Sequence, residues 1–108
     1  MWVRRKEEEA QSLHSEALAR LAEGDLEGAE ALGRRLEAMG WAGAFEVLAL
    51  VRRKRGDLSG AIAALDEGTA LAPETWSLHV LRGNLLDEAG RRDDALEAFE
   101  VALRCPGA

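Results

Sequence analysis

A six-residue segment that begins with glycine occurs three times and constrains the fold more than any other feature. Its copies are Gly-Asp-Leu-Glu-Gly-Ala at 24–29, Gly-Asp-Leu-Ser-Gly-Ala at 56–61 and the looser Gly-Arg-Arg-Asp-Asp-Ala at 90–95. Each copy lies between two stretches whose apolar residues recur with a helical period, so each predicts the tight turn of a helical hairpin. The first glycines are 32 and then 34 residues apart, a spacing typical of stacked hairpin repeats.

The turn residues also predict where the helices end and begin. Gly24 and its equivalents are expected to have positive φ, as glycine commonly does just after a helix. Asp25 then occupies the position of an N-cap for the next helix. Asp93 and Asp94 are interpreted in the same way, by capping and by complementing the helix dipole. Residues 2–9 fit either a frayed tail or an extra turn of the first helix.

Composition favours helix and restricts the class of partner. Tyrosine is absent and the net charge is -6, which argues against a general affinity for nucleic acid or anionic membranes. Cys105 is the only cysteine, so a reducing compartment is the simpler assumption. No secretory signal and no stretch of roughly 20 apolar residues is present. We expect one cytoplasmic domain over residues 1–108, with no cofactor, no metal and neither nucleic acid nor a membrane as partner.

The order of large and small residues in the hairpins resembles that of the tetratricopeptide repeat (TPR) family. The second unit carries the resemblance most fully, in Phe45, Leu48, Ala49, Gly56, Ala61, Leu65, Gly68 and Pro73. The resemblance implies an all-α, right-handed α-α superhelix, a solenoid of three TPR-like helical hairpins, with units at about 10–40, 41–73 and 74–106. Gly33 lies inside a predicted helix and weakens it by about 1 kcal/mol relative to alanine. We therefore expect a close helix crossing at Gly33.

The resemblance further implies that the first helix of each hairpin lines a concave groove. The face opposite each packing stripe supplies the candidate groove residues Gln11, His14, Leu18, Glu46, Leu50, Arg53, Val80, Asn84 and Asp87. Some family members hold the terminal carboxylate of a peptide with Lys, Arg and Asn side chains on these helices. Here only Asn84 and Arg53 favour that ligand, and Glu46 and Asp87 oppose its charge. A peptide or helix anchored by apolar side chains fits this surface better.

The last predicted helix has apolar residues on more than one face, and no helix follows to cover them. These residues are Leu96, Phe99, Val101 and Leu103. Because an exposed apolar surface usually marks an interface, they are the candidate residues for self-association, including exchange of hairpins between copies. Contact with a further domain is the alternative.

The residues that could carry chemistry have simpler interpretations. His14 and His79 lie in different units, without the ligand spacing of a metal site. Cys105 has no basic partner in the sequence. The basic run at 52–55 is interpreted as the last turn of a helix, where cations favour the negative end of the dipole. A local anion site shared with residues 4–6 is the alternative. We therefore predict no catalytic residue and no enzymatic activity.

Together these features predict a protein-interaction scaffold that binds a peptide or helix in its concave groove and forms a homo-oligomer through its uncapped C-terminal end. A purely structural homo-oligomerisation module with no peptide ligand is the alternative. The residues do not indicate which protein or peptide is the partner.

Overall fold

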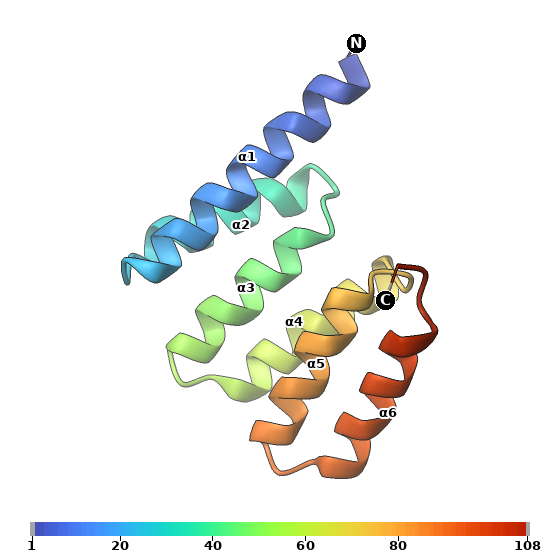
Figure 1. Cartoon of the computed structure of the whole chain (residues 1–108). Helices are drawn as coiled ribbons and strands as arrows, with labels where there is room; N and C mark the ends of the chain where they lie inside the picture. Colours follow the sequence, from blue (N-terminus) through green and yellow to red (C-terminus); the bar gives the residue numbers. More distant parts are fainter. Residues whose placement is uncertain (1, 108) are drawn as a thin grey trace.

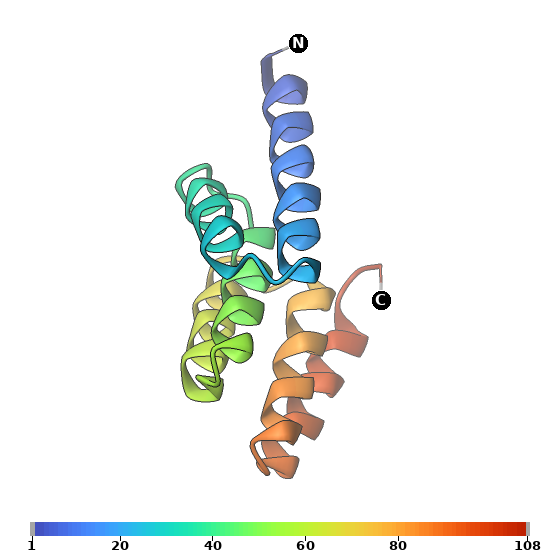
Figure 2. The same ribbon diagram turned by 90° about the vertical axis from the view of Figure 1, so that its left-hand side faces the viewer.

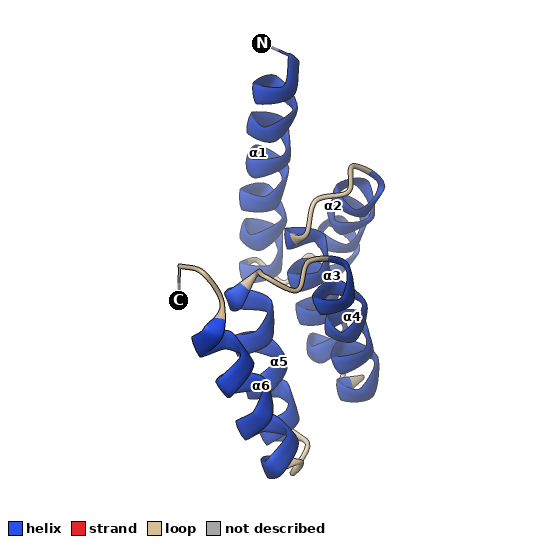
Figure 3. Ribbon diagram, turned by 90° about the vertical axis from the view of Figure 1, so that its right-hand side faces the viewer, coloured by secondary structure: helices blue, strands red, loops and turns tan. Residues whose placement is uncertain are grey.

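The chain is entirely helical wherever its structure is described. The computed structural model describes the backbone of residues 2–107 and the side chains of residues 5–107. Within this range it contains helices and connecting turns but no strand (Figure 3). The helices are α1 (Trp2–Ala22), α2 (Leu26–Ala38), α3 (Gly43–Lys54), α4 (Leu58–Leu71), α5 (Trp76–Glu88) and α6 (Arg92–Arg104). The predicted all-α fold class is confirmed, and residues 2–9 are extra turns of α1.

The helices form three hairpins, each packed on the hairpin before it. The hairpins are α1–α2, α3–α4 and α5–α6, and α3 also packs on α2 while α5 packs on α4. In Figure 1, α1, α3 and α5 run side by side in the same direction, with α2 and α4 behind them. Figure 2 shows the same hairpins from the side, as successive layers of an elongated body. This arrangement is the predicted helical solenoid.

Contacts between hairpins involve the odd-numbered helices. α3 contacts both α1 and α2, and α5 contacts both α3 and α4. In the part of the chain that the structure describes, the backbones of α2 and α4 do not come close to each other, and neither do those of α4 and α6. Each joint between hairpins therefore depends on one helix that is inserted against the hairpin before it. None of the helices between residues 2 and 107 has the length and apolar character needed to cross a membrane.

The repeated turn has the conformation that its residues predict. Gly24, Gly56 and Gly90 have φ values of +83°, +82° and +79°. The Asp25 carboxylate accepts a hydrogen bond of 2.9 Å from the backbone N–H of Gly28. Asp57 makes the same 2.9 Å bond with Gly60. The predicted glycine stop and aspartate cap are thus confirmed in the first two turns.

The third turn differs, and the prediction that Asp93 and Asp94 cap α6 is wrong. The N-cap residue is Arg91, which makes no side-chain hydrogen bond to the helix end. Both aspartates lie inside the first turn, where they complement the helix dipole. The Nε of Arg91 donates to the Asp94 carboxylate over 3.0 Å. The reason is the sequence of this copy, which has arginine where the other two copies have the capping aspartate.

Glycines inside the helices mark the closest approaches between helices. A methyl group added at Gly33 would lie 2.9 Å from Cδ2 of Leu48 and 3.1 Å from Cγ1 of Val47, both on α3. The close crossing predicted at Gly33 is therefore present between α2 and α3. A methyl group added at Gly68 would lie 2.7 Å from Cβ of Phe45. Because a Cβ atom moves only with its backbone, this second contact leaves no room for a larger residue.

We expect Gly68→Ala to destabilise the fold by about 1 kcal/mol. Overpacking against Phe45 costs roughly 1–3 kcal/mol, and the gain in helix propensity returns only about 1 kcal/mol. The matched control is Ala63→Gly at an exposed position of the same helix, which should lose about 1 kcal/mol from propensity alone. The measurement is the free energy of unfolding in urea. A Gly68→Ala chain more stable than the parent would show that α3 and α4 are not in tight contact at this point.

Candidate functional site

The predicted groove residues lie on α1, α3 and α5, which form one face of the solenoid (Figure 1). They occupy equivalent positions in the successive repeats, since the offsets of 32 and 34 residues relate them to one another. The equivalent sets are His14, Glu46 and Val80, then Leu18, Leu50 and Asn84. One face therefore brings together side chains that are far apart in the sequence.

Two of these residues bind each other across the joint between the first two hairpins. His14 Nε2 donates a hydrogen bond of 2.8 Å to Oε1 of Glu46. A methyl group added at Gly43 would lie 2.8 Å from Nδ1 of His14, so the bare backbone at this position makes room for the imidazole. His14 thus links α1 to α3 and is not an isolated surface histidine.

A second pair crosses the joint between α3 and α5. The guanidinium of Arg53 donates to Glu88 in a bidentate arrangement, with Nε at 3.0 and 2.9 Å from the two carboxylate oxygens and Nη2 at 2.7 Å from Oε1. The hydrogen bond from Arg53 holds the pKa of Glu88 below its ordinary range, and the same bond raises the pKa of Arg53. Both side chains are about two-fifths exposed, so water screens the attraction.

The basic run at 52–55 turns its side chains toward different neighbours. It lies at the end of α3, as predicted. Arg52 donates to the backbone carbonyl of Gly60 over 3.0 Å. Arg55 pairs with Glu30 of α2 at 3.1 Å. With Arg53 on Glu88, three of the four cations are engaged within the chain, and the side chain of Arg4 from the alternative anion site lies outside the described residues.

Apolar side chains on the same helices are partly or largely exposed. Leu18 is 38% exposed, while Leu50 and Val80 are half-buried. Leu50 also packs against the core formed by the first two hairpins. Of the remaining groove candidates, Gln11 and Asn84 are exposed. Asp87 is also exposed, with its carboxylate 3.7 Å from Nε of Arg92 on α6.

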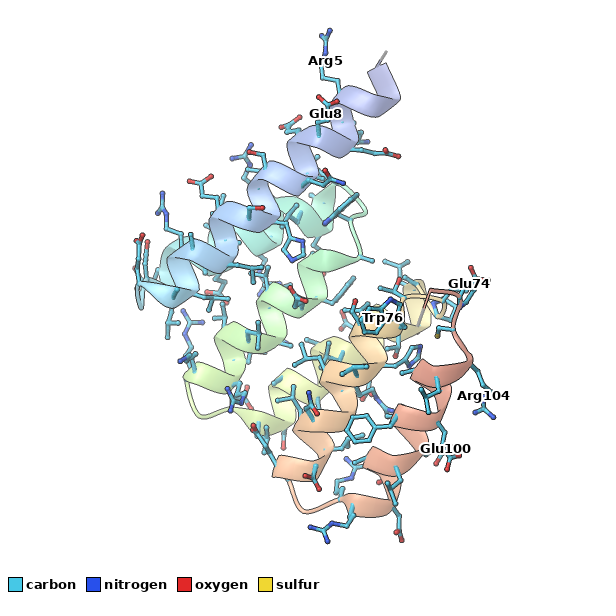
Figure 4. All side chains as sticks on the ribbon, in the orientation of Figure 1. Arg5, Glu8, Glu74, Trp76, Glu100 and Arg104 are labelled. Carbon is cyan, nitrogen blue, oxygen red and sulfur yellow. The ribbon has the colours of Figure 1, made fainter. Side chains whose placement is uncertain are left out.

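The third hairpin has an apolar cavity of about 290 Å³ between α5 and α6. It is lined by Trp76, Val80, Phe99, Ala102 and Leu103. Trp76 lies at the start of α5, on the side where the chain turns toward its C-terminus (Figure 4). Sequence reasoning missed Trp76 and Ala102, and it assigned Val80 to the concave groove alone. Val80 lines this cavity.

Three of the four predicted self-association residues share one stripe on α6. Leu96, Phe99 and Leu103 are three and then four residues apart, which places them on the same helical face. Leu96 is 55% exposed and Leu103 is 79% exposed. Val101 lies elsewhere, in a polar depression that includes His79 and Arg82. We name Leu96, Phe99 and Leu103 the terminal stripe.

The remaining candidate residues for chemistry make structural contacts. His79 is buried and its Nε2 donates to the carbonyl of Pro73 over 2.8 Å. Cys105 lies with its Sγ 3.4 Å from the carbonyl of Val101. Among residues 5–107, no group of three or more His, Cys, Asp or Glu side chains is arranged to hold a metal ion. Neither residue therefore contributes to a cluster of chemically active side chains.

Comparisons with known proteins agree with this geometry. A family model described as tetratricopeptide repeat matches residues 47–108. Two crystal structures of MamA have a similar fold, with TM-scores of 0.72 and 0.70 and 24% sequence identity in each case. Each alignment covers 87% of this chain, which spans 56% and 52% of the two MamA chains, about half of their length. Comparison with curated protein sequences gives no match.

The bridge between Arg53 and Glu88 can be tested by titration. We expect Arg53→Met to raise the pKa of Glu88 to the ordinary glutamate range, because the guanidinium that stabilises the carboxylate is gone. Arg55→Met is the matched control, since Arg55 pairs with Glu30 and should leave Glu88 unchanged. The measurement is the chemical shift of the Glu88 carboxyl carbon against pH. A pKa that stays low in Arg53→Met would contradict the bridge.

The same bridge predicts how stability depends on pH. The pKa of Glu88 is lower in the folded than in the unfolded chain, so the pair stabilises the fold at neutral pH and loses this contribution as the pH falls through the lowered pKa. Because both groups are exposed, the contribution is below about 1 kcal/mol. The difference in unfolding free energy between the parent and Glu88→Gln should therefore be small at pH 7 and vanish in acid.

Proposed function

Because this chain belongs to the tetratricopeptide repeat family, we propose that it binds a peptide or helix on the concave face of α1, α3 and α5 and associates with itself through the free end of α5 and α6. Proteins of this family are generally non-catalytic scaffolds for protein interactions. A general role in holding proteins together follows from membership. The concave-face ligand and the self-association are the specific parts of the proposal.

The observation that supports the concave-face proposal is that charged side chains on these helices are already paired with one another. His14 binds Glu46, and Arg53 binds Glu88. A ligand recognised by charge would have to displace these partners. Contact with Leu18 or Val80 displaces no partner and removes apolar surface from water. These contacts support a ligand anchored by apolar side chains, such as an amphipathic helix or a short extended peptide.

A peptide held by its terminal carboxylate fits this face poorly. Arg53 is the one arginine among the groove candidates, and its Nε and Nη2 donors already bind Glu88. Asp87 and Glu46 add negative charge on the same helices. Like charges next to an anionic ligand disfavour its binding. The arrangement therefore supports an apolar anchor over a carboxylate clamp.

The exposed apolar surface of the third hairpin supports self-association. Its cavity is lined by apolar side chains, and Leu103 at the cavity edge is mostly exposed. An apolar surface of this kind is stabilised when another protein surface covers it. The same observation favours the second candidate function, a homo-oligomerisation module with no peptide ligand, because Leu103 and Leu96 are both more exposed than Leu18 on the concave face.

Selection from a displayed peptide library tests the concave face. We expect selected peptides to share apolar anchors and to lose binding to Leu18→Asp by at least about tenfold, because a buried carboxylate would replace an apolar contact. Leu71→Asp is the matched control. Leu71 is 61% exposed at the end of α4, outside the concave face, so its substitution should leave peptide affinity unchanged. The affinity is measured by calorimetry with purified peptides.

Two outcomes of this selection would reject the concave-face ligand. One is the selection of no peptide from a library that contains both helical and extended members. The other is equal loss of affinity in Leu18→Asp and Leu71→Asp, which would place the binding surface elsewhere. If either outcome is accompanied by concentration-dependent oligomers, the homo-oligomerisation module becomes the better description.

A further inference from the structure

The two ends of the solenoid differ in the positions that join one hairpin to the next. Each odd-numbered helix has three equivalent positions on the side toward the preceding hairpin. They are Ser12, Ser15 and Ala19 in α1, Ala44, Val47 and Val51 in α3, and Leu78, Leu81 and Leu85 in α5. The residues of α3 and α5 pack into the two apolar cores. Those of α1 are exposed. The end of the solenoid that α1 forms, which we call the leading end, therefore has small or polar residues at these joining positions.

The opposite end of the solenoid, which we call the trailing end, is formed by α6 and has apolar residues at its joining positions. Leu96 of α6 is equivalent to Ile62 of α4, and Phe99 is equivalent to Leu65. Ile62 is 7% exposed and belongs to the core that includes α5, whereas Leu96 is 55% exposed. The trailing end thus presents apolar residues at positions that are covered in the preceding hairpin.

From this difference we infer that two copies of the chain associate through their trailing ends, across a twofold axis, and form a closed dimer. This inference rests on the proposed self-association and specifies its geometry. If the leading end of another copy bound there, Ser12 and Ser15 would be pressed against apolar side chains. Burying hydroxyl groups without hydrogen-bond partners is unfavourable. A twofold contact instead covers both apolar ends and leaves none free for growth.

The charges beside the terminal stripe are complementary under this symmetry. Glu100 and Arg104 project from α6 on the side away from α5 (Figure 4), and both are exposed. Neither makes an ion pair within residues 5–107. Suppose that the α6 helices of two copies cross antiparallel and that the twofold axis passes near residue 101. Phe99 of each copy then meets Leu103 of the other. The same crossing brings Glu100 of each copy close to Arg104 of the other.

Sedimentation velocity over a wide concentration range tests the closed dimer. We expect a monomer–dimer equilibrium with no larger species. Leu103→Asp should weaken the dimer by at least about tenfold, because it places a carboxylate in the apolar contact. Leu71→Asp, at a residue that is 61% exposed on α4, should not weaken it. Circular dichroism checks that both variants keep their helices.

Charge reversal tests the twofold axis itself. Glu100→Arg alone and Arg104→Glu alone each place like charges across the interface and should each weaken the dimer several-fold. The two substitutions combined restore opposite charges and should return the dissociation constant close to that of the parent.

The outcomes separate this inference from the proposed function. Oligomers that grow beyond the dimer, or association abolished by Ser15→Arg on the leading end, would overturn the twofold arrangement and leave self-association standing. Failure of the double reversal to restore the dimer would also overturn it. A chain that stays monomeric at all concentrations would reject self-association and this inference together. Peptide binding on the concave face would be unaffected by that result.

Discussion

The insertion of one helix against the preceding hairpin is the contact on which the rest of this structure depends. Each hairpin alone would leave an apolar side exposed, and the next odd-numbered helix covers it. Between α2 and α3 the approach is closest at Gly33, where a methyl group would lie 2.9 Å from Cδ2 of Leu48 and would force that side chain to shift. The joint places α1 beside α3, so the face that carries the proposed binding residues depends on it.

Features encoded locally could be predicted from the sequence. Turn glycines and capping aspartates act on neighbouring residues, so the ends of the helices followed from Gly24, Asp25 and their equivalents. The close crossing at Gly33 was also predictable, because a glycine inside a helix weakens it unless packing compensates. Where the third copy lacks the aspartate, the same reasoning failed, because Asp93 and Asp94 lie too far along α6 to cap it.

Features that depend on how helices are offset could not be read from the pattern. Arg53 and Glu88 are 35 residues apart, and their contact requires α3 and α5 to be placed with a particular stagger. Glu88 was therefore absent from the predicted groove. Trp76 is equivalent to the small residue Ala42 in the second hairpin, so comparison of the repeats did not indicate that Trp76 would line a cavity. Its position beside the terminal cavity is clear only in three dimensions.

The missing contact between α2 and α4 has a mechanical consequence. The backbones of α2 and α4 are not close neighbours within the described chain, so the hairpins are joined through the line of odd-numbered helices. The bridges from His14 to Glu46 and from Arg53 to Glu88 lie on that line and are partly hydrated. A change in the angle between hairpins would therefore be taken up at the joints made by α3 and α5, and it would alter the spacing of the side chains on the face formed by α1, α3 and α5.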